Sequence, residues 1–164
     1  MVTTEAILDV LRTIDDPEMP ISIVDLGLIE DVAIDDGNVT ISVLPTFVGC
    51  PALPMIADDI TTRVAALAGV GHTDVRFVYE PPWSVDRISD EGRASLKSHG
   101  VTVPLPGAVE LRTSAIHCPF CGSDRTTLDS MFGPTRCRMI YYCNACRNSF
   151  EHMKKLSPNP GTIA

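Results

Sequence analysis

The spacing of apolar side chains along the first half of the chain predicts two helices separated by a β-hairpin. Residues 4–14 repeat apolar positions every three or four residues, as one face of an amphipathic helix does. The runs 28–35 and 38–44 flank Asp36-Gly37, and an Asp-Gly pair between two strand-like runs is a strong hairpin signal. A second apolar stripe at helical spacing predicts a helix from about residue 51 to residue 68.

The pattern continues with a third strand and a further short helix. Residues 74–80 are rich in β-branched and aromatic side chains and end at two prolines, which is typical of a strand. Ser89 is placed to cap a short helix that Gly100 ends. These elements predict an α+β domain over residues 1–100, a small sheet with flanking helices. The prolines within residues 101–112 predict a short linker after it.

Composition narrows the class of protein. The chain has 164 residues, of which 45% are hydrophobic and 21% are charged, as in globular proteins. It contains no run of about 18 apolar residues, so we expect no membrane span. The first residues lack the basic and then apolar pattern of a signal peptide, which predicts a cytoplasmic protein with reduced thiols.

Charge is divided unevenly along the chain. Residues 1–112 carry 7 Lys/Arg and 18 Asp/Glu, a net charge of −11, whereas residues 113–164 carry 6 and 3, a net charge of +3. An acidic first part repels nucleic-acid phosphates, so any contact with nucleic acid would fall to the C-terminal part. The alternative is that the two parts attract each other within one molecule.

Two Cys-x-x-Cys pairs near the C-terminus predict a metal-binding module. Residues 113–156 contain too few apolar side chains to fold by core burial alone, and a closed site of four thiolates favours a structural zinc ion that would stabilise them. The same spacing accepts a single iron or an iron–sulfur cluster, so the metal stays open at this point. Residues 157–164 are expected to form a flexible tail. The predicted ligands are Cys118, Cys121, Cys143 and Cys146.

Two further cysteines lie outside these pairs. Cys137 is either a small buried hydrophobe or a second redox or metal residue. Cys50 precedes Pro51, and a proline at the first helical position would make Cys50 the N-cap of the following helix. The helix dipole would then favour a reactive thiolate there. The alternative for Cys50 is a structural cysteine buried beside a turn.

Several short motifs within residues 4–155 resemble a known family. The motifs of the first domain resemble those of the SufT-like domain associated with iron–sulfur assembly. The whole series of motifs resembles the D subunit of the phenylacetyl-CoA epoxidase (ring-oxygenase) system. The first group of motifs is Asp16-Pro17-Glu18, Asp25-Leu26-Gly27-Leu28 and Gly49-Cys50-Pro51. The second is Pro81-Pro82-Trp83, Ile88-Ser89-Asp90-Glu91-Gly92, Cys118-Pro119 with Cys121-Gly122, Phe132-Gly133 with Thr135 and Cys137, and Tyr142-Cys143 with Cys146.

The resemblance implies an accessory protein rather than the oxygenase itself. In that system a di-iron subunit performs the ring epoxidation, and a reductase subunit supplies electrons through flavin and an iron–sulfur centre. The D subunit is implied to assist iron–sulfur cluster or metal delivery to the reductase, in aerobic phenylacetate catabolism. Carried over, Cys50 is the transient cluster ligand or reactive thiol, with Asp25 as its polar partner. The implied cofactors are structural zinc and a transient iron–sulfur cluster, and the implied partners are the reductase or other subunits.

Two other classes of function compete with this one. A zinc ribbon can serve as a protein–protein or nucleic-acid interaction module without any metal transfer, and basic and aromatic residues near the ribbon favour that alternative. A Cys50-dependent enzyme would need a second catalytic residue, and the sequence identifies none. Exposed strands in a small sheet are compatible with a homodimer.

Overall fold

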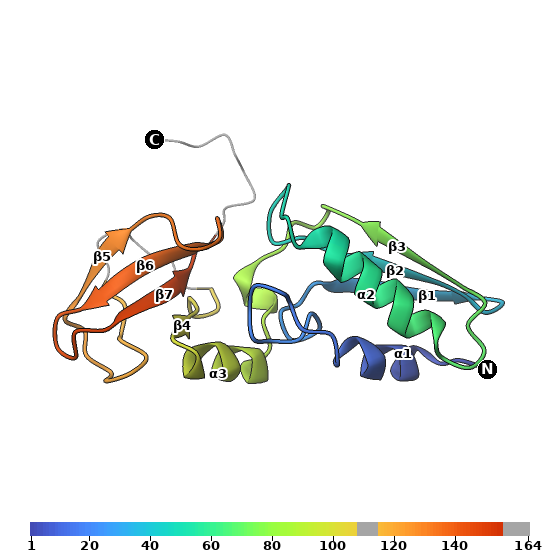
Figure 1. Ribbon diagram of the computed structural model, residues 1–164, viewed down its shortest axis with the longest axis horizontal. Coiled ribbons are helices and arrows are strands. Elements are labelled where there is room, and N and C mark those ends of the chain that lie inside the picture. Colours follow the sequence, from blue (N-terminus) through green and yellow to red (C-terminus); the bar gives the residue numbers. More distant parts are fainter. Residues whose placement is uncertain (108–114, 156–164) are drawn as a thin grey trace. The chain divides into compact units, whose positions relative to one another are not determined.

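The computed structural model describes residues 1–107 and 115–155, which form two compact units (Figure 1). The first unit spans Met1–Trp83, and the second begins at Ser84. The expected fold class, a small α+β sheet followed by a four-cysteine ribbon, is confirmed. Among the helices of the described ranges, none combines the length and apolar character that a bilayer crossing requires.

The first unit is a three-stranded sheet covered by two helices. The strand order is β1-β2-β3; β1 and β2 pair antiparallel, and β3 pairs parallel to β2. The predicted hairpin turn is present, with φ of 43° at Asp36 and 80° at Gly37. Its elements are α1 (Thr4–Leu11), β1 (Ile29–Asp35), β2 (Asn38–Val43), α2 (Leu53–Ala65) and β3 (His72–Phe77).

The parallel arrangement of β3 follows from α2, which carries the chain back along the sheet before β3 begins (Figure 1). Alternate residues of β2 are buried, and so is one side of α2, so that the strand and the helix both contribute to the core. That shared core consists of Val39, Ile41 and Val43 from the strand, and Ile56, Ile60 and Val64 from the helix. The sheet is therefore one-sided, with its other face polar.

The first helix is shorter than the sequence predicts. It ends at Leu11 rather than at residue 14, because Ile14 accepts a hydrogen bond from the Ile23 backbone (2.9 Å) and Asp15 forms a bridge with Ser22. These long-range contacts compete with the helical hydrogen bonds, and hydrophobic spacing alone does not register them.

The second unit is a four-stranded sheet preceded by short helices. The strand order is β4-β7-β6-β5, in which β4 pairs parallel to β7 and the other neighbours pair antiparallel. The guanidinium of Arg93 donates to the carbonyls of Val85 and Pro104 (2.6 Å each), which fixes α3 to the segments on either side of it. The elements are η1 (Val85–Arg87), α3 (Asp90–Ser98), β4 (Val101–Thr102), β5 (Thr126–Ser130), β6 (Arg138–Cys143) and β7 (Ser149–Met153).

The division of the chain differs from the predicted domains. The short helix expected at the end of the first domain, α3, lies in the second unit. The expected linker 101–112 begins with a strand, since Val101 pairs with Glu151 and Thr102 with His152. A two-residue strand has too little pattern to be predicted from sequence. Residues 108–112 of that linker, and the expected tail 157–164, lie outside the described residues.

Candidate metal centre and thiol loop

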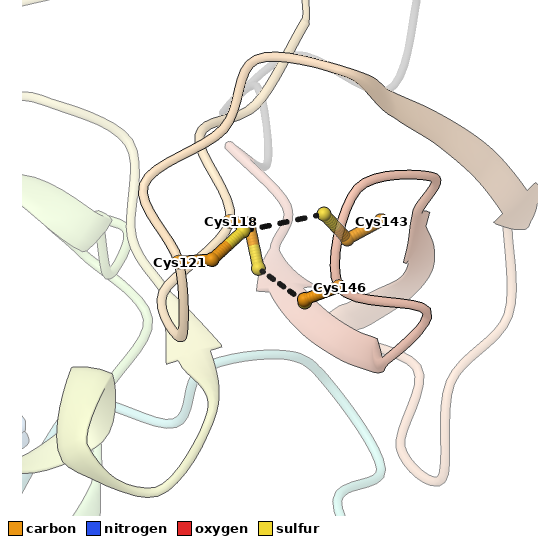
Figure 2. A group of neighbouring side chains, drawn as sticks. All are labelled: Cys118, Cys121, Cys143 and Cys146. Carbon is orange, nitrogen blue, oxygen red and sulfur yellow. Dashed lines mark hydrogen bonds between the residues drawn. The ribbon is translucent and has the colours of Figure 1, made fainter.

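The four cysteines of the two Cys-x-x-Cys pairs meet in the second unit. Cys118 and Cys121 come from the loop before β5, and Cys143 and Cys146 come from the end of β6 and the turn that follows it (Figure 2). Their Sγ atoms all lie within 4.8 Å of one another. Two of these distances are 3.7 Å, from Cys118 to Cys146, and 3.6 Å, from Cys121 to Cys143.

Two turns of the same geometry hold the four cysteine sulfur atoms, which together are called the cage. In the first, Cys118 accepts from the Gly122 N–H and donates its own N–H to Ser123 (2.9 Å each). In the second, Cys143 makes the same pair of hydrogen bonds with Arg147 and Asn148 (2.9 Å each). The fourth residue after each first cysteine is left-handed, with φ of 74° at Gly122 and 63° at Arg147. The two turns thus present their sulfur atoms in the same way, toward a common centre.

The donor set fits a single metal ion. A tetrahedron of thiolates about 2.3 Å from a metal has edges of about 3.8 Å, close to the sulfur–sulfur distances of 3.7 and 3.6 Å. A two-iron cluster would place each turn on a different iron and would push the two turns further apart. All four positions are taken by protein sulfur, which is the arrangement of a structural site rather than of a catalytic one.

The surroundings of Cys146 and Cys121 shift the pKa values of their thiols in opposite directions. At Cys146 the Asn148 backbone N–H outweighs burial and, with the Asn148 side chain and the thiols of Cys118 and Cys121, lowers the pKa to about 6. At Cys121 the Ser123 backbone N–H acts in the same direction, but burial and the neighbouring thiols outweigh it and raise the pKa to about 11. A bound cation would remove this competition, since it stabilises all four thiolates together.

Packing behind the cage depends on the cage itself. The apolar cluster of the ribbon consists of Cys118, Tyr141, Cys143 and Phe150, so half of its members are predicted ligands. Tyr141 and Phe150 are register partners on β6 and β7 and stack with ring centroids 5.7 Å apart. A metal bound in the cage and the small core would therefore stabilise each other.

Cys137 and His152 are buried in the ribbon outside the cage. Cys137 is 3% exposed, and its Sγ lies 3.1 Å from the Thr135 hydroxyl, outside the cage. This favours the small buried hydrophobe over a metal residue. His152 is 1% exposed, and its Nδ1 lies 2.7 Å from the Thr102 hydroxyl. The ring also meets Tyr141 edge-on, at 5.8 Å.

Cys50 is not the N-cap of the long helix, which corrects the expectation from the sequence. The helix α2 begins at Leu53 with Ala52 as its N-cap, and Cys50 lies in the preceding turn, where its carbonyl accepts from the Leu53 N–H (3.3 Å). Pro54, rather than Pro51, occupies the first helical turn. The dipole argument for a thiolate at Cys50 therefore loses its basis.

The loop around Cys50 is nevertheless open to solvent. Cys50 itself is partly exposed, and Gly49 and Pro51 on either side of it are exposed. Val48 is 77% exposed, although it is apolar. Gly49 has φ of 82°, a conformation that glycine adopts readily, and nothing lies within 4 Å of the position a Cβ would take. Cys50 is therefore not a fully buried residue.

The segment with Asp25 reaches the same end of the sheet as the Cys50 loop. Ile29, at the start of β1, pairs with Val43, at the end of β2, so the chain before β1 and the chain after β2 meet there. Within its own turn Asp25 accepts from the Ser22 hydroxyl (2.9 Å). The Trp83 indole, from beyond β3, donates to the Leu26 carbonyl (3.0 Å). A direct Asp25–Cys50 contact stays a prediction.

Sequence reasoning missed two residues that shape the second turn beside the cage. Asn148 lies two positions after Cys146, and its side-chain Nδ2 donates to the Cys146 Sγ (3.5 Å). Arg147 takes the left-handed conformation that Gly122 has in the first turn. Aligning the two Cys-x-x-Cys segments on each other would have revealed both positions.

Comparison with known proteins accounts for both units. An Escherichia coli protein, named as the D subunit of a "Putative 1,2-phenylacetyl-CoA epoxidase", is 33% identical over 148 residues, which cover 88% of each chain. The chain belongs to this D-subunit family. Residues 4–77 match the family described as iron-sulfur cluster assembly protein, and residues 106–154 match the PaaD zinc beta ribbon domain. The recognition made from the motifs is confirmed.

The first part of the chain also has relatives without a ribbon. A Porphyromonas gingivalis Fe-S protein maturation auxiliary factor is 38% identical over 95 residues, 57% of this chain and 90% of that protein. Among solved structures, a domain of unknown function, DUF59, from Bacillus anthracis superposes with a TM-score of 0.54 at 32% identity. It covers 56% of this chain and 89% of that one. The family thus joins a separately occurring assembly domain to a metal-binding ribbon.

Proposed function

We propose that this chain is an accessory protein of the phenylacetyl-CoA epoxidase system that assists delivery of an iron–sulfur cluster to the reductase component. The exposed loop of Cys50 carries the proposal, because it offers a thiol to solvent within a domain whose relatives are named as Fe-S protein maturation factors. The cage of the ribbon holds a permanent zinc ion, through Cys118, Cys121, Cys143 and Cys146.

The four-cysteine cage and Cys50 have different roles in this proposal. A closed cage of four thiolates has no vacant position, so its metal exchanges slowly and serves the fold. Cys50 is the one cysteine in residues 1–83, so it supplies a single ligand to a cluster whose other ligands come from elsewhere. A cluster held by few protein ligands passes more easily to an acceptor with a full set. Asp25 is the proposed polar partner of this thiol.

The transfer is a ligand exchange and moves no electrons. The Cys50 thiolate gives up its bond to an iron atom when a thiolate of the acceptor forms one. The proton released by the acceptor thiol returns to Cys50 directly or through solvent. Such a step needs access to the sulfur, and the partial exposure of Cys50 in an exposed loop supports it.

The test measures cluster content in the partner reductase after co-expression with this chain. The variant Cys50→Ser should lower iron and acid-labile sulfide in the purified reductase as much as omission of the chain does. The matched control is Cys137→Ala, which removes a thiol that is buried and outside the cage. Full cluster occupancy with Cys50→Ser would remove the delivery role and leave a scaffold.

A further inference from the structure

The loop between β5 and β6 carries an exposed aromatic side chain on a backbone that hydrogen bonds hold in place. Phe132 is 73% exposed, yet its backbone is bound on both sides to the Ser130 hydroxyl, which donates to the Phe132 carbonyl (2.9 Å) and accepts its N–H (3.1 Å). Gly133 donates to the Arg138 carbonyl (2.9 Å). A Cβ at Gly133 would lie 3.1 Å from Arg138 atoms, so the loop is closely packed behind the ring.

A lysine from the far end of the ribbon supports the same ring. Lys154 Nζ lies 5.0 Å from the centroid of Phe132, within the range of a cation–π interaction. The same ammonium donates to the Arg136 carbonyl (2.8 Å), which ties the loop to the residue after β7. Hydrogen bonds therefore hold the backbone of Phe132, and the Lys154 ammonium contacts its ring, although most of the side chain faces solvent.

We infer that this loop, residues 130–136, is a docking anchor for a protein partner that presents an apolar pocket bordered by acidic side chains. Exposed single hydrophobic residues are common, but one on a constrained loop loses less backbone entropy when it enters a pocket. Two more apolar side chains, Met131 in the loop and Leu128 on the edge strand β5, are each 37% exposed near Phe132 in the sequence. Aromatic and methionine side chains are enriched at the centres of such contacts.

Charge indicates the chemistry of the partner. The described ribbon, residues 115–155, contains 6 Lys/Arg and 3 Asp/Glu. Arg138 and Glu151 neutralise each other internally at 2.6 Å, which leaves the excess positive charge on the surface. Lys154 contacts the anchor ring itself, and Arg136 lies in the loop. Such a surface attracts an acidic partner and speeds its association at low salt.

A protein fits this surface better than a nucleic acid does. Proteins that bind single strands stack successive bases on a series of aromatic rings. Here the other large hydrophobic side chains exposed near Phe132 in the sequence, Leu128 and Met131, carry no aromatic ring. The partner would then be a subunit of the epoxidase system, and this identity rests on the proposed function.

The experiment measures binding of the metal-loaded full chain to the purified reductase and epoxidase subunits, by titration calorimetry at low and high salt. We expect Phe132→Ala to weaken binding at least tenfold, and Lys154→Gln to weaken it about threefold while reducing its salt dependence. Leu105→Ala is the matched control, because Leu105 is also 73% exposed in the second unit but lies outside the loop. Unchanged metal content and melting temperature would show that each variant is folded.

The outcomes separate this inference from the proposed function. Binding that requires Phe132, together with normal cluster content in Cys50→Ser, would retain the anchor and remove the delivery role. Wild-type affinity in Phe132→Ala, or no binding of the wild-type chain to any subunit, would overturn the anchor. Phe132-dependent self-association in sedimentation, or Phe132-dependent binding of a single-stranded oligonucleotide, would overturn it in favour of a second copy or of a nucleic acid.

Discussion

Removal of the metal should unfold the ribbon and leave the first unit intact. The apolar cluster of the ribbon has four buried members, and two of them, Cys118 and Cys143, are predicted ligands. The other two are aromatic side chains whose burial contributes about 3 kcal/mol each at most. A structural zinc site contributes roughly 10–16 kcal/mol in small domains, about twice the two aromatic contributions together. The strands β5, β6 and β7 should therefore lose their order when the metal leaves.

Hydrogen exchange read segment by segment is the assay for this expectation. After treatment with a chelator at neutral pH, amides of β6 and β7 should exchange like those of an unfolded chain, while amides of β2 and α2 stay protected. The core of the first unit contains no predicted ligand. Cys143→Ser should reproduce the effect without a chelator, and Cys50→Ser should not. Persistent protection of β6 in the metal-free chain would refute the reasoning.

Three further perturbations test the structure. Arg147→Gly should stabilise the metal-loaded chain by about 1 kcal/mol in denaturant titration, because the φ of 63° is strained for arginine; a loss of stability would contradict the turn geometry. Arg138→Ala should lower the free energy of unfolding by about 3 kcal/mol, because it leaves a Glu151 oxygen buried without its cation. The double variant Arg138→Met with Glu151→Leu should recover most of this loss. In the metal-loaded chain an alkylating reagent should modify Cys50 first and spare Cys137 until unfolding, as peptide mass spectrometry would show; early modification of Cys137 would contradict its 3% exposure.

Local signals in the sequence were sufficient for much of the fold. The Asp-Gly turn, the apolar stripe of α2 and the Ser89 cap of α3 each depend on neighbouring residues, and each is present in the structure. The cage was predictable because each Cys-x-x-Cys pair forms its own turn. Features that depend on residues distant in the sequence, such as the parallel pairing of β3 with β2, could not be predicted.

The error at Cys50 has a specific physical cause. Two prolines, Pro51 and Pro54, are both compatible with the start of a helix, and the sequence offers no way to rank them. The structure uses Pro54 and leaves Pro51 in the preceding turn. The contact at the end of the first sheet was likewise not predictable, because Leu26 and Trp83, which the indole hydrogen bond joins, lie far apart in the sequence.

The pairing of β4 with β7 determines which fragments of this protein can be expressed as folded units. Val101 and Thr102 cover part of a strand that would otherwise offer free backbone amides and carbonyls to any passing chain. An isolated ribbon expressed from residue 113 onward would expose β7 and tend to aggregate. A fragment expressed from Ser84 onward would keep β4 paired with β7. The ribbon is therefore transplantable only together with the short helices that precede it.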